Sequence, residues 1–318
     1  MSRAIIPQEL YDLIVDYLHT ERSALSSCAL VCRAWVPASR FHLFEHVSLA
    51  KHQWNAAARL NELLASPYAT FAPSVRSLEF YNALTLVQFR HPRTGHIHVK
   101  PLLKIVPLIV QFTQIRSLAL SDLPFEVLSA FSKVQTLRLV GITAGPALLR
   151  LAAHLPSLTH LTLQRVVAIP YRASSADTMP VAAQIQALRR VTVRGSSIAF
   201  LGWLGVLAPY ASALDLGDFC PSELPCLVMF LLNMKTPLES LELELLSGTE
   251  MREFAWDELA RALGERTRLT VRVYVNDQED LESEAEDDEE QAGEASILAA
   301  QFPKLEERGM LEFKRISG

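Results

Sequence analysis

The residues best suited to metal chemistry are three histidines close together in the chain, His91, His96 and His98. Imidazole is a common metal ligand, and alternating positions such as 96 and 98 lie on one side of a strand. The surrounding segment 90–100 contains no Asp, Glu or Cys that could complete a ligand set. We therefore expect a polar, hairpin-like insertion there, with a metal site as the open alternative.

The rest of the chain shows no motif that carries catalysis. It lacks GxxxxGK[ST], GxGxxG, HExxH and GxSxG. Cys28 and Cys32 are four residues apart in a helical pattern, and Cys220 and Cys226 lie around a proline-containing turn, so all four thiols are expected to pack in the core. We expect a non-catalytic protein without cofactor or metal. An enzyme whose triad converges only in space stays an alternative.

The composition is that of a core-forming protein with one strongly acidic segment. Half of the 318 residues are apolar and 20% are charged. Residues 277–294 hold eleven carboxylates and no Lys or Arg; without them the net charge of -5 becomes +6. Like charges at this density predict a disordered loop. It could be a contact for a basic partner, an intramolecular screen for the basic remainder of the chain, or a tolerated surface insertion. A pI near 6.0 argues against nucleic acid as the main partner.

The sequence also predicts the compartment. Glu9, Asp12 and Asp16 lie where a signal peptide needs an apolar core, and four cysteines are too few for a disulfide scaffold. A cytoplasmic or nuclear location is therefore expected. The uncharged stretch 195–214 has membrane length, but its glycines and proline favour a buried helix and strand. We expect no membrane partner.

One short pattern recurs along the chain: an apolar residue, two others, then apolar-x-apolar. Each copy predicts a strand with one buried face. From Leu118 to Val271 the copies are 19 to 30 residues apart, which leaves room for a helix between strands. Pro101, Pro146 and Pro221 suit first helical turns, and Ser222 is a possible cap. The copies lie at 75–80, 115–120, 134–139, 158–163, 188–193, 211–216, 238–243, 268–273 and 310–313, and the expected helices at 55–66, 101–112, 145–155, 197–207, 222–233 and 252–264.

Strand plus helix every 20–30 residues resembles leucine-rich repeats, over residues 74–318. The resemblance implies an α/β fold, an irregular solenoid in which stacked units share a core and the strands form a parallel sheet. A less regular α/β domain is the alternative. Where the family places Asn or Cys after the strand, this chain has Leu123, Ile142, Val166, Ser196, Phe219 and Leu246, so no amide or thiol can satisfy backbone groups at the turn.

Residues 5–49 predict three short helices that open at Pro7, near a Ser23 cap and at Pro37. Leu30 and Val31 fall off the apolar side of the second helix, which indicates a surface for a partner. The apolar sides carry Leu10, Leu13, Ile14, Tyr17 and Leu18 on the first helix, and Leu25, Cys28, Cys32 and Trp35 along the second.

These residues resemble an F-box. The family opens with an apolar-Pro pair followed by Glu-Leu, present here at 6–7 and 9–10, and an apolar helix, here 14–18. Its second half carries Val-Cys-Arg-x-Trp, here 31–35, and it closes near a Leu-Phe pair, here 43–44. The alternative is an N-terminal cap that shields the first repeat from water.

The resemblance implies the substrate-recognition subunit of a ubiquitin ligase. F-box domains bind a Skp-type adaptor that joins them to a cullin–RING ligase, and a repeat domain behind them captures an as yet unknown protein substrate. The expected domains are a short three-helix F-box at 1–50, a helical linker at 51–73 and the repeat domain at 74–318. The alternative is a repeat interaction module without a ligase role. The implied adaptor contacts are Ile6, Pro7, Leu10, Ile14, Leu25, Leu30, Val31 and Trp35, of which Trp35 could equally be core.

On the strands, the residues beside the buried leucines are expected to face outward and bind the substrate. Arg138, Arg190 and Arg194 make the middle of this face basic, which favours an acidic or phosphorylated partner segment. An ordinary solvated strand face is the alternative. The predicted substrate-binding residues are Arg138, His160, Thr162, Arg190, Arg194, Asp215 and Glu242.

Overall fold

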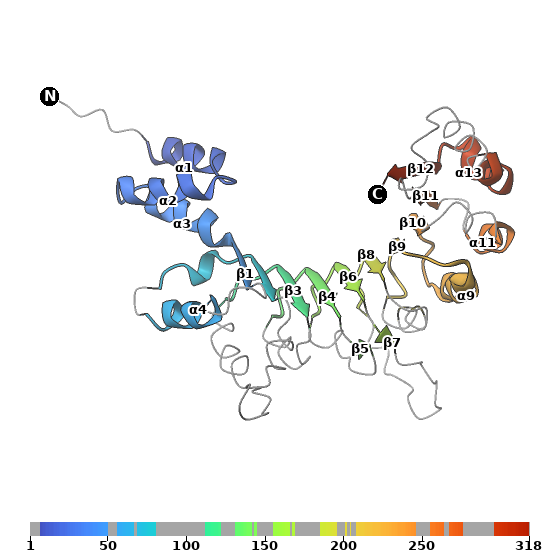
Figure 1. Ribbon diagram of the computed structural model, residues 1–318, viewed down its shortest axis with the longest axis horizontal. Helices are drawn as coiled ribbons and strands as arrows, with labels where there is room; N and C mark the ends of the chain where they lie inside the picture. Colours follow the sequence, from blue (N-terminus) through green and yellow to red (C-terminus); the bar gives the residue numbers. More distant parts are fainter. Residues whose placement is uncertain are drawn as a thin grey trace. The chain divides into compact units, whose positions relative to one another are not determined.

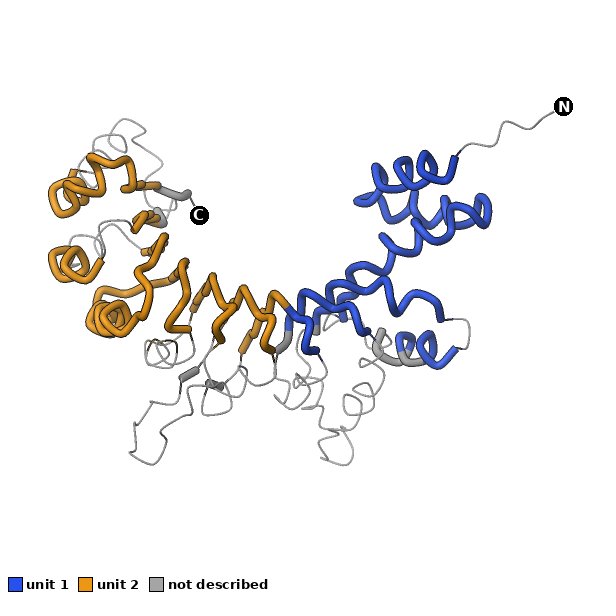
Figure 2. The backbone as a smooth tube through the Cα atoms, turned by 180° about the vertical axis from the view of Figure 1, so that it is seen from behind, with its two compact units in different colours: residues 1–134 blue, residues 135–318 orange. Residues whose placement is uncertain are grey.

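The structure is a computed structural model, and the chain forms two compact units, residues 1–134 and 135–318 (Figure 2). The insertion expected at 90–100 and the acidic loop 277–294 lie outside the described residues, as do the helices expected at 101–112 and 145–155 except for their last residues, Phe112 and Leu155. The described residues are 7–49, 56–66, 69–80, 112–121, 131–141, 143–144, 155–165, 167–168, 185–195, 201, 204, 208–245, 255–263, 267–275 and 296–317. The predicted division at residues 50 and 73 stays a prediction.

The first unit begins with the three predicted helices (Figure 1). They are α1 (Gln8–Tyr17), α2 (Arg22–Val31) and α3 (Val36–Glu45). Pro7 precedes α1 and Pro37 lies in the first turn of α3, where a missing N–H leaves no intrahelical bond unmade. Ser23 is not the cap of α2, because Glu21 holds that position and Ser23 lies inside the first turn.

Polar contacts from α3 fix the three helices against one another. His42 Nε2 lies 2.7 Å from Asp16 Oδ1 on α1, and the His42 side chain is largely buried. Arg22 on α2 donates through Nη2 to the Leu43 carbonyl at 3.1 Å. The apolar centre of the bundle includes Val15 and Leu25, both fully buried.

The chain passes from α3 directly into β1 (His46–Leu49), which the sequence analysis did not predict. β1 pairs in parallel with β2 (Ser77–Phe80), and β2 pairs with β3 (Ser117–Ser121). The helix expected at 55–66 is α4 (Ala56–Ala65), followed by the 3-10 turn η1 (Ala72–Ser74). The helical segment is therefore continuous with the first strand of the sheet.

Among its described residues, the second unit has seven parallel strands paired in chain order. Together with β2 and β3 they confirm all nine strands expected from the repeated pattern. Two short strands that the pattern did not predict, β5 (Thr143–Ala144) and β7 (Val167–Ala168), pair separately. The seven strands are β4 (Thr136–Val140), β6 (His160–Gln164), β8 (Arg190–Arg194), β9 (Ala213–Gly217), β10 (Ser240–Leu245), β11 (Arg268–Val275) and β12 (Leu311–Ser317).

Helices cover one side of the later strands in this unit (Figure 1). They are η4 (Pro221–Glu223), α9 (Leu224–Asn233), α11 (Trp256–Ala262) and α13 (Pro303–Glu307). Leu201 and Leu204, the two described residues of the helix expected at 197–207, are helical and buried. Ser222 is not a cap: Cys220 precedes η4, and its N–H donates to Glu223 Oε2 at 3.0 Å.

A left-handed residue ends four strands of this unit and explains how the turns are satisfied without the family's Asn. Gly141, Arg165, Gly195 and Asp218 follow β4, β6, β8 and β9 with φ of 65°, 52°, 56° and 56°. The Gly141 N–H donates to the Gln164 carbonyl at 2.8 Å, and the Arg165 N–H donates to the Arg194 carbonyl at 2.9 Å. The turns after β4 and β6 thus bond to the backbone of the next repeat.

The turn conformation predicts opposite effects of two substitutions. Gly195→Ala should destabilise the fold by about 1 kcal/mol, because a left-handed backbone strains any residue with a Cβ. Steric crowding adds little, since the new Cβ would lie 3.6 Å from its nearest neighbours. Arg165→Gly should be neutral or stabilising by up to about 1 kcal/mol. Urea unfolding of both variants checks this, and a destabilising Arg165→Gly would contradict it.

Candidate interaction surfaces

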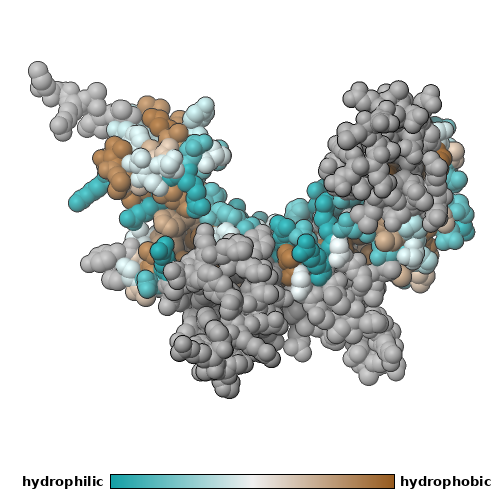
Figure 3. Space-filling view, in the orientation of Figure 1, coloured by the Kyte–Doolittle hydropathy of each residue, from teal (hydrophilic) through white to brown (hydrophobic). Residues whose placement is uncertain are grey.

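Six large apolar side chains lie exposed on α1 and α2, and we call them the N-terminal apolar surface. Tyr17 and Leu30 are each 87% exposed. Figure 3 shows apolar side chains gathered over these helices. Exposed apolar side chains that gather in one region mark a candidate interaction site on a folded protein. The surface consists of Leu10, Leu13, Ile14, Tyr17, Leu30 and Val31.

The apolar stripe of α1 is largely exposed: Leu10, Leu13, Ile14 and Tyr17 face solvent, and Leu18 is half-buried. Val15, which is off the stripe, is buried. Tyr11 contacts Trp35 with ring centroids 5.7 Å apart, and Gln8 Nε2 donates to the Ala34 carbonyl at 3.0 Å. These contacts fix the rotation of α1, so Leu13 and its neighbours stay uncovered.

The implied adaptor residues divide into three groups. Pro7, Leu10, Ile14, Leu30 and Val31 are exposed. Leu25 is fully buried, which makes it part of the bundle core, and Trp35 is half-buried against α1. Ile6 lies outside the described residues. Leu13 and Tyr17 belong to the same surface but were absent from the predicted set, although their helical spacing from Leu10 was visible in the sequence.

The expectation that all four thiols pack in the core is wrong for two of them. Cys28 is buried, but Cys32 is exposed where α2 has ended, in extended backbone. Cys226 is exposed in the first turn of α9, and Cys220 is half-buried. None of the four cysteines forms a disulfide.

The seven predicted substrate-binding residues all lie on the outward face of the second unit's sheet, which we call the sheet face. Their strand neighbours Leu137, Leu161 and Leu214 are buried, as the alternation predicts. The register places them side by side in adjacent strands. Arg138 pairs with Thr162, His160 with Arg190, and Asp215 with Glu242.

One charge network crosses three strands of the sheet face. Arg194 on β8 lies over Gly217 on β9 and places Nη2 3.6 Å from Asp215 Oδ2 and 3.4 Å from Glu244 Oε2 on β10. Glu244 is buried, so its carboxylate depends on this guanidinium. A Cβ on Gly217 would lie 2.8 Å from Arg194 Cγ. The absence of a side chain at this position therefore makes room for the Arg194 side chain to reach Glu244.

The neighbouring charges are also partnered. Arg272 Nη2 lies 2.7 Å from Glu242 Oε2. Burial raises the pKa of Asp215, an effect that Arg194 opposes and Glu242 reinforces. The arginines of the predicted basic patch therefore differ in their partners. Arg194 belongs to the internal network, whereas Arg190 is exposed and makes no ion pair within the described part of the chain.

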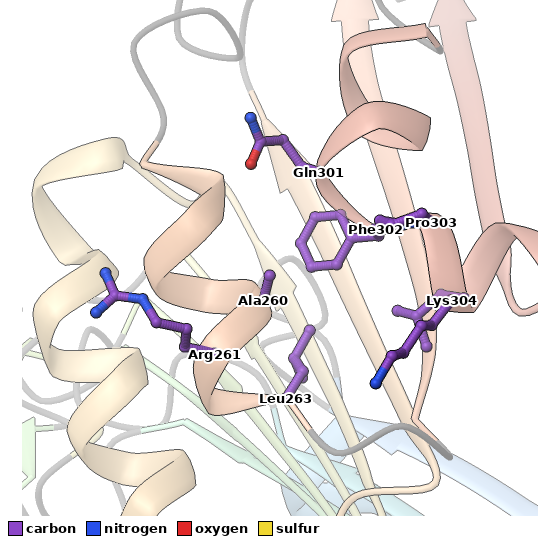
Figure 4. Close-up of a pocket in the computed structure, with 8 residues that line it drawn as sticks. Ala260, Arg261, Leu263, Gln301, Phe302, Pro303 and Lys304 are labelled. Carbon is purple, nitrogen blue, oxygen red and sulfur yellow. The ribbon is translucent and has the colours of Figure 1, made fainter.

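A crevice of about 420 Å³ lies between α11 and the helical residues 296–307 (Figure 4). Leu263 and Phe302 form part of its wall, and Arg261 donates to Asp257 on its own helix at 3.3 Å. Its lining holds no carboxylate, imidazole or thiol, and its ionisable side chains are those of Arg261 and Lys304.

Among the described residues, no three His, Cys, Asp or Glu side chains are grouped as a metal site requires. None of the described helices has the length and apolar character needed to cross a bilayer.

The charge network predicts an unusual cost for a small substitution. Gly217→Ala should destabilise the fold by about 1–3 kcal/mol, because the new methyl group displaces Arg194 and leaves buried Glu244 without its partner. In an Arg194→Ala background the same change should cost under about 0.5 kcal/mol. A double-mutant cycle by urea unfolding measures the difference; equal costs in both backgrounds would contradict the network.

The raised pKa of Asp215 predicts how the free energy of unfolding changes with pH. Because its pKa is raised in the folded state, the folded protein binds this proton more readily than the unfolded chain, and stability rises as pH falls through the raised pKa. Asp215→Asn removes this gain. The free energy of unfolding of the wild type minus that of the variant should therefore increase between pH 7 and pH 4. A constant or decreasing difference would show that burial does not dominate at this carboxylate.

Comparison with known proteins identifies no family for this chain. No protein-family model matches the chain, and no curated protein matches it. Among solved structures, the chain is similar to the leucine-rich repeat-containing protein LegL7 from Legionella pneumophila. The identity is 15% and the TM-score 0.40, over 86% of this chain and 90% of that one.

Proposed function

We propose that this protein is the substrate-recognition subunit of a Skp adaptor–cullin–F-box ubiquitin ligase. In this role α1 and α2 bind the adaptor, and the sheet face captures the protein to be ubiquitinated. The observation that carries the proposal is the N-terminal apolar surface. It is built largely by the residues through which the F-box resemblance implies adaptor binding.

The chemistry of this surface restricts its partner. The six side chains carry no charge, and their burial on binding would release water from two adjacent helices. Large aromatic and aliphatic side chains that stand free of their own core are typical anchors of an interface. The contacts of Tyr11 and His42 keep α1 in place before binding, which limits the entropy lost on association.

The sheet face supports the receptor part of the proposal. Parallel strands in register present side chains as a fixed array on which a partner chain can be recognised. A receptor of this kind needs no catalytic residue of its own, since the ligase supplies the chemistry. The adaptor and the ligase act in the cytoplasm and nucleus, the location expected from the sequence.

A repeat interaction module without a ligase role is the second candidate. The observation that favours it is the direct passage of α3 into β1, which joins the helices to the sheet as a cap would be joined. Phe44 of α3 also contacts Phe71, with ring centroids 4.6 Å apart. A cap, however, has no use for an uncovered apolar surface on its outer helices.

Adaptor binding separates the two candidates. Leu30→Asp and Tyr17→Asp should each weaken binding of a purified Skp-type adaptor at least about thirtyfold, because each buries a charge in the interface. The matched control is Leu232→Asp, which changes a leucine that is 66% exposed on α9 of the second unit. Calorimetric titration measures all four proteins. A folded wild type that does not bind, or an equal loss in the control, would contradict the ligase role.

A further inference from the structure

The strand β12 is the last strand of the sheet in the second unit, and beyond it no further strand lies among the described residues. Leu311 and Phe313 pair in register with Leu269 and Val271 of β11 and point to the same side of the sheet. Leu269 and Val271 are fully buried, whereas Leu311 and Phe313 are only half-buried. The last layer of the core is therefore partly uncovered by the part of the chain that the structure describes.

The backbone of β12 has hydrogen-bonding groups on the same edge. The Leu269 N–H donates to the Met310 carbonyl at 2.9 Å, so this carbonyl points toward β11. Successive residues of a strand point their backbone groups to opposite sides, so Glu312 also faces β11, and Leu311 and Phe313 face the outer edge. Such a row of backbone groups is a template on which another strand can pair.

The direction of these groups restricts how β12 of a second copy can pair there in the antiparallel orientation. Residues that face the edge must lie opposite one another, which allows a twofold axis at any one residue of the strand. Axes at residues 312, 314 and 315 set Glu312, Lys314 and Arg315 against their own copies, and an axis at 311 gives Glu312 no opposite charge. The axis at Phe313 sets Glu312 of each copy opposite Lys314 of the other. Charge complementarity therefore selects this register.

The side chains of Glu312 and Lys314 are accessible for such a pairing. Their exposed fractions are 35% and 51%. Within one chain, Lys314 Nζ lies 2.8 Å from Glu312 Oε1, and Arg268 Nη2 lies 3.7 Å from Glu312 Oε2. A lysine on an edge strand commonly repels an incoming strand. Here the glutamate two residues before the lysine makes the edge complementary to a second copy of itself.

We propose that β12 pairs in antiparallel orientation with β12 of a second copy of this chain, around a twofold axis at Phe313. The two half-buried Phe313 side chains then lie opposite each other, and two pairs of Glu312 with Lys314 join the copies. The assembly closes at two chains, because each copy uses its edge once. The interface is short, so the dissociation constant should be about 1–100 µM. This dimer goes beyond the proposed receptor function and does not depend on it.

Sedimentation equilibrium of the full chain from about 1 to 300 µM tests the dimer. The wild type should show a reversible monomer–dimer equilibrium. Glu312→Lys and Lys314→Glu should each weaken the dimer at least about tenfold, because each change turns both cross-strand pairs into like charges. An equimolar mixture of the two variants should dimerise again with an affinity near that of the wild type, since every lysine then lies opposite a glutamate.

Two control variants separate the edge from other surfaces. Asp257→Lys reverses an exposed carboxylate on α11 that also pairs with an arginine, at 3.3 Å from Arg261 Nη2, and should leave the dimer unchanged. Leu30→Asp alters the N-terminal apolar surface and should also keep it. A wild type that stays monomeric would overturn the proposal. So would species larger than a dimer, or an equal loss of the dimer in either control.

Hydrogen–deuterium exchange of the wild type tests the same edge without any substitution. Raising the concentration from about 1 to 300 µM should slow exchange of the amides of Leu311 and Phe313 and leave β10 unchanged. Unchanged exchange at these two amides would overturn the proposal even if the reversed-charge variants did not fold. Folded edge variants should bind the adaptor as the wild type does, so failure of the dimer and failure of the ligase role are separate results.

Discussion

The alternation of apolar and polar residues along parallel strands in register is the constraint on which the second unit depends. Leu137, Leu161, Val191 and Leu214 occupy equivalent positions in four consecutive strands, and each is buried. Because the side-chain period of a strand is two, burying this ladder forces the intervening residues outward in ladders of their own. The core therefore builds the sheet face, and function becomes a question of which residues occupy the outward positions.

That arrangement also brings charges close together that are distant in sequence. Asp215 and Glu242 are neighbours across strands, and the folded protein offsets their repulsion with Arg194 and Arg272. Because Gly217 has no side chain, the Arg194 side chain can extend across β9 to buried Glu244. Arg138 on β4 and Arg190 on β8 have no carboxylate partner among the described residues, so their positive charge stays uncompensated there. Internal pairing thus divides the sheet face into a structural region and a region available for a ligand.

The sequence predicted the strands well because their signal is local: two apolar residues in alternation after a fixed spacing. The missed strand β1 carries the same signal at Phe44, Val47 and Leu49, but those residues were assigned to the helical segment. Helical periodicity found the stripe on α1, yet it could not tell which side packs against α3, because that depends on contacts such as Tyr11 with Trp35. The partners of Arg194 depend on strand register, which a single sequence does not contain.

The central claim is that α1 and α2 form a docking surface for a Skp-type adaptor, and hydrogen–deuterium exchange tests it most directly. The full chain would be compared with and without a saturating amount of purified adaptor. The account predicts added protection of amides within residues 8–31, with unchanged exchange in α9, whose exposed Met229 and Leu232 are also apolar. Unchanged exchange in α1 and α2 in the presence of adaptor, or protection confined to the strands of the sheet face, would contradict it.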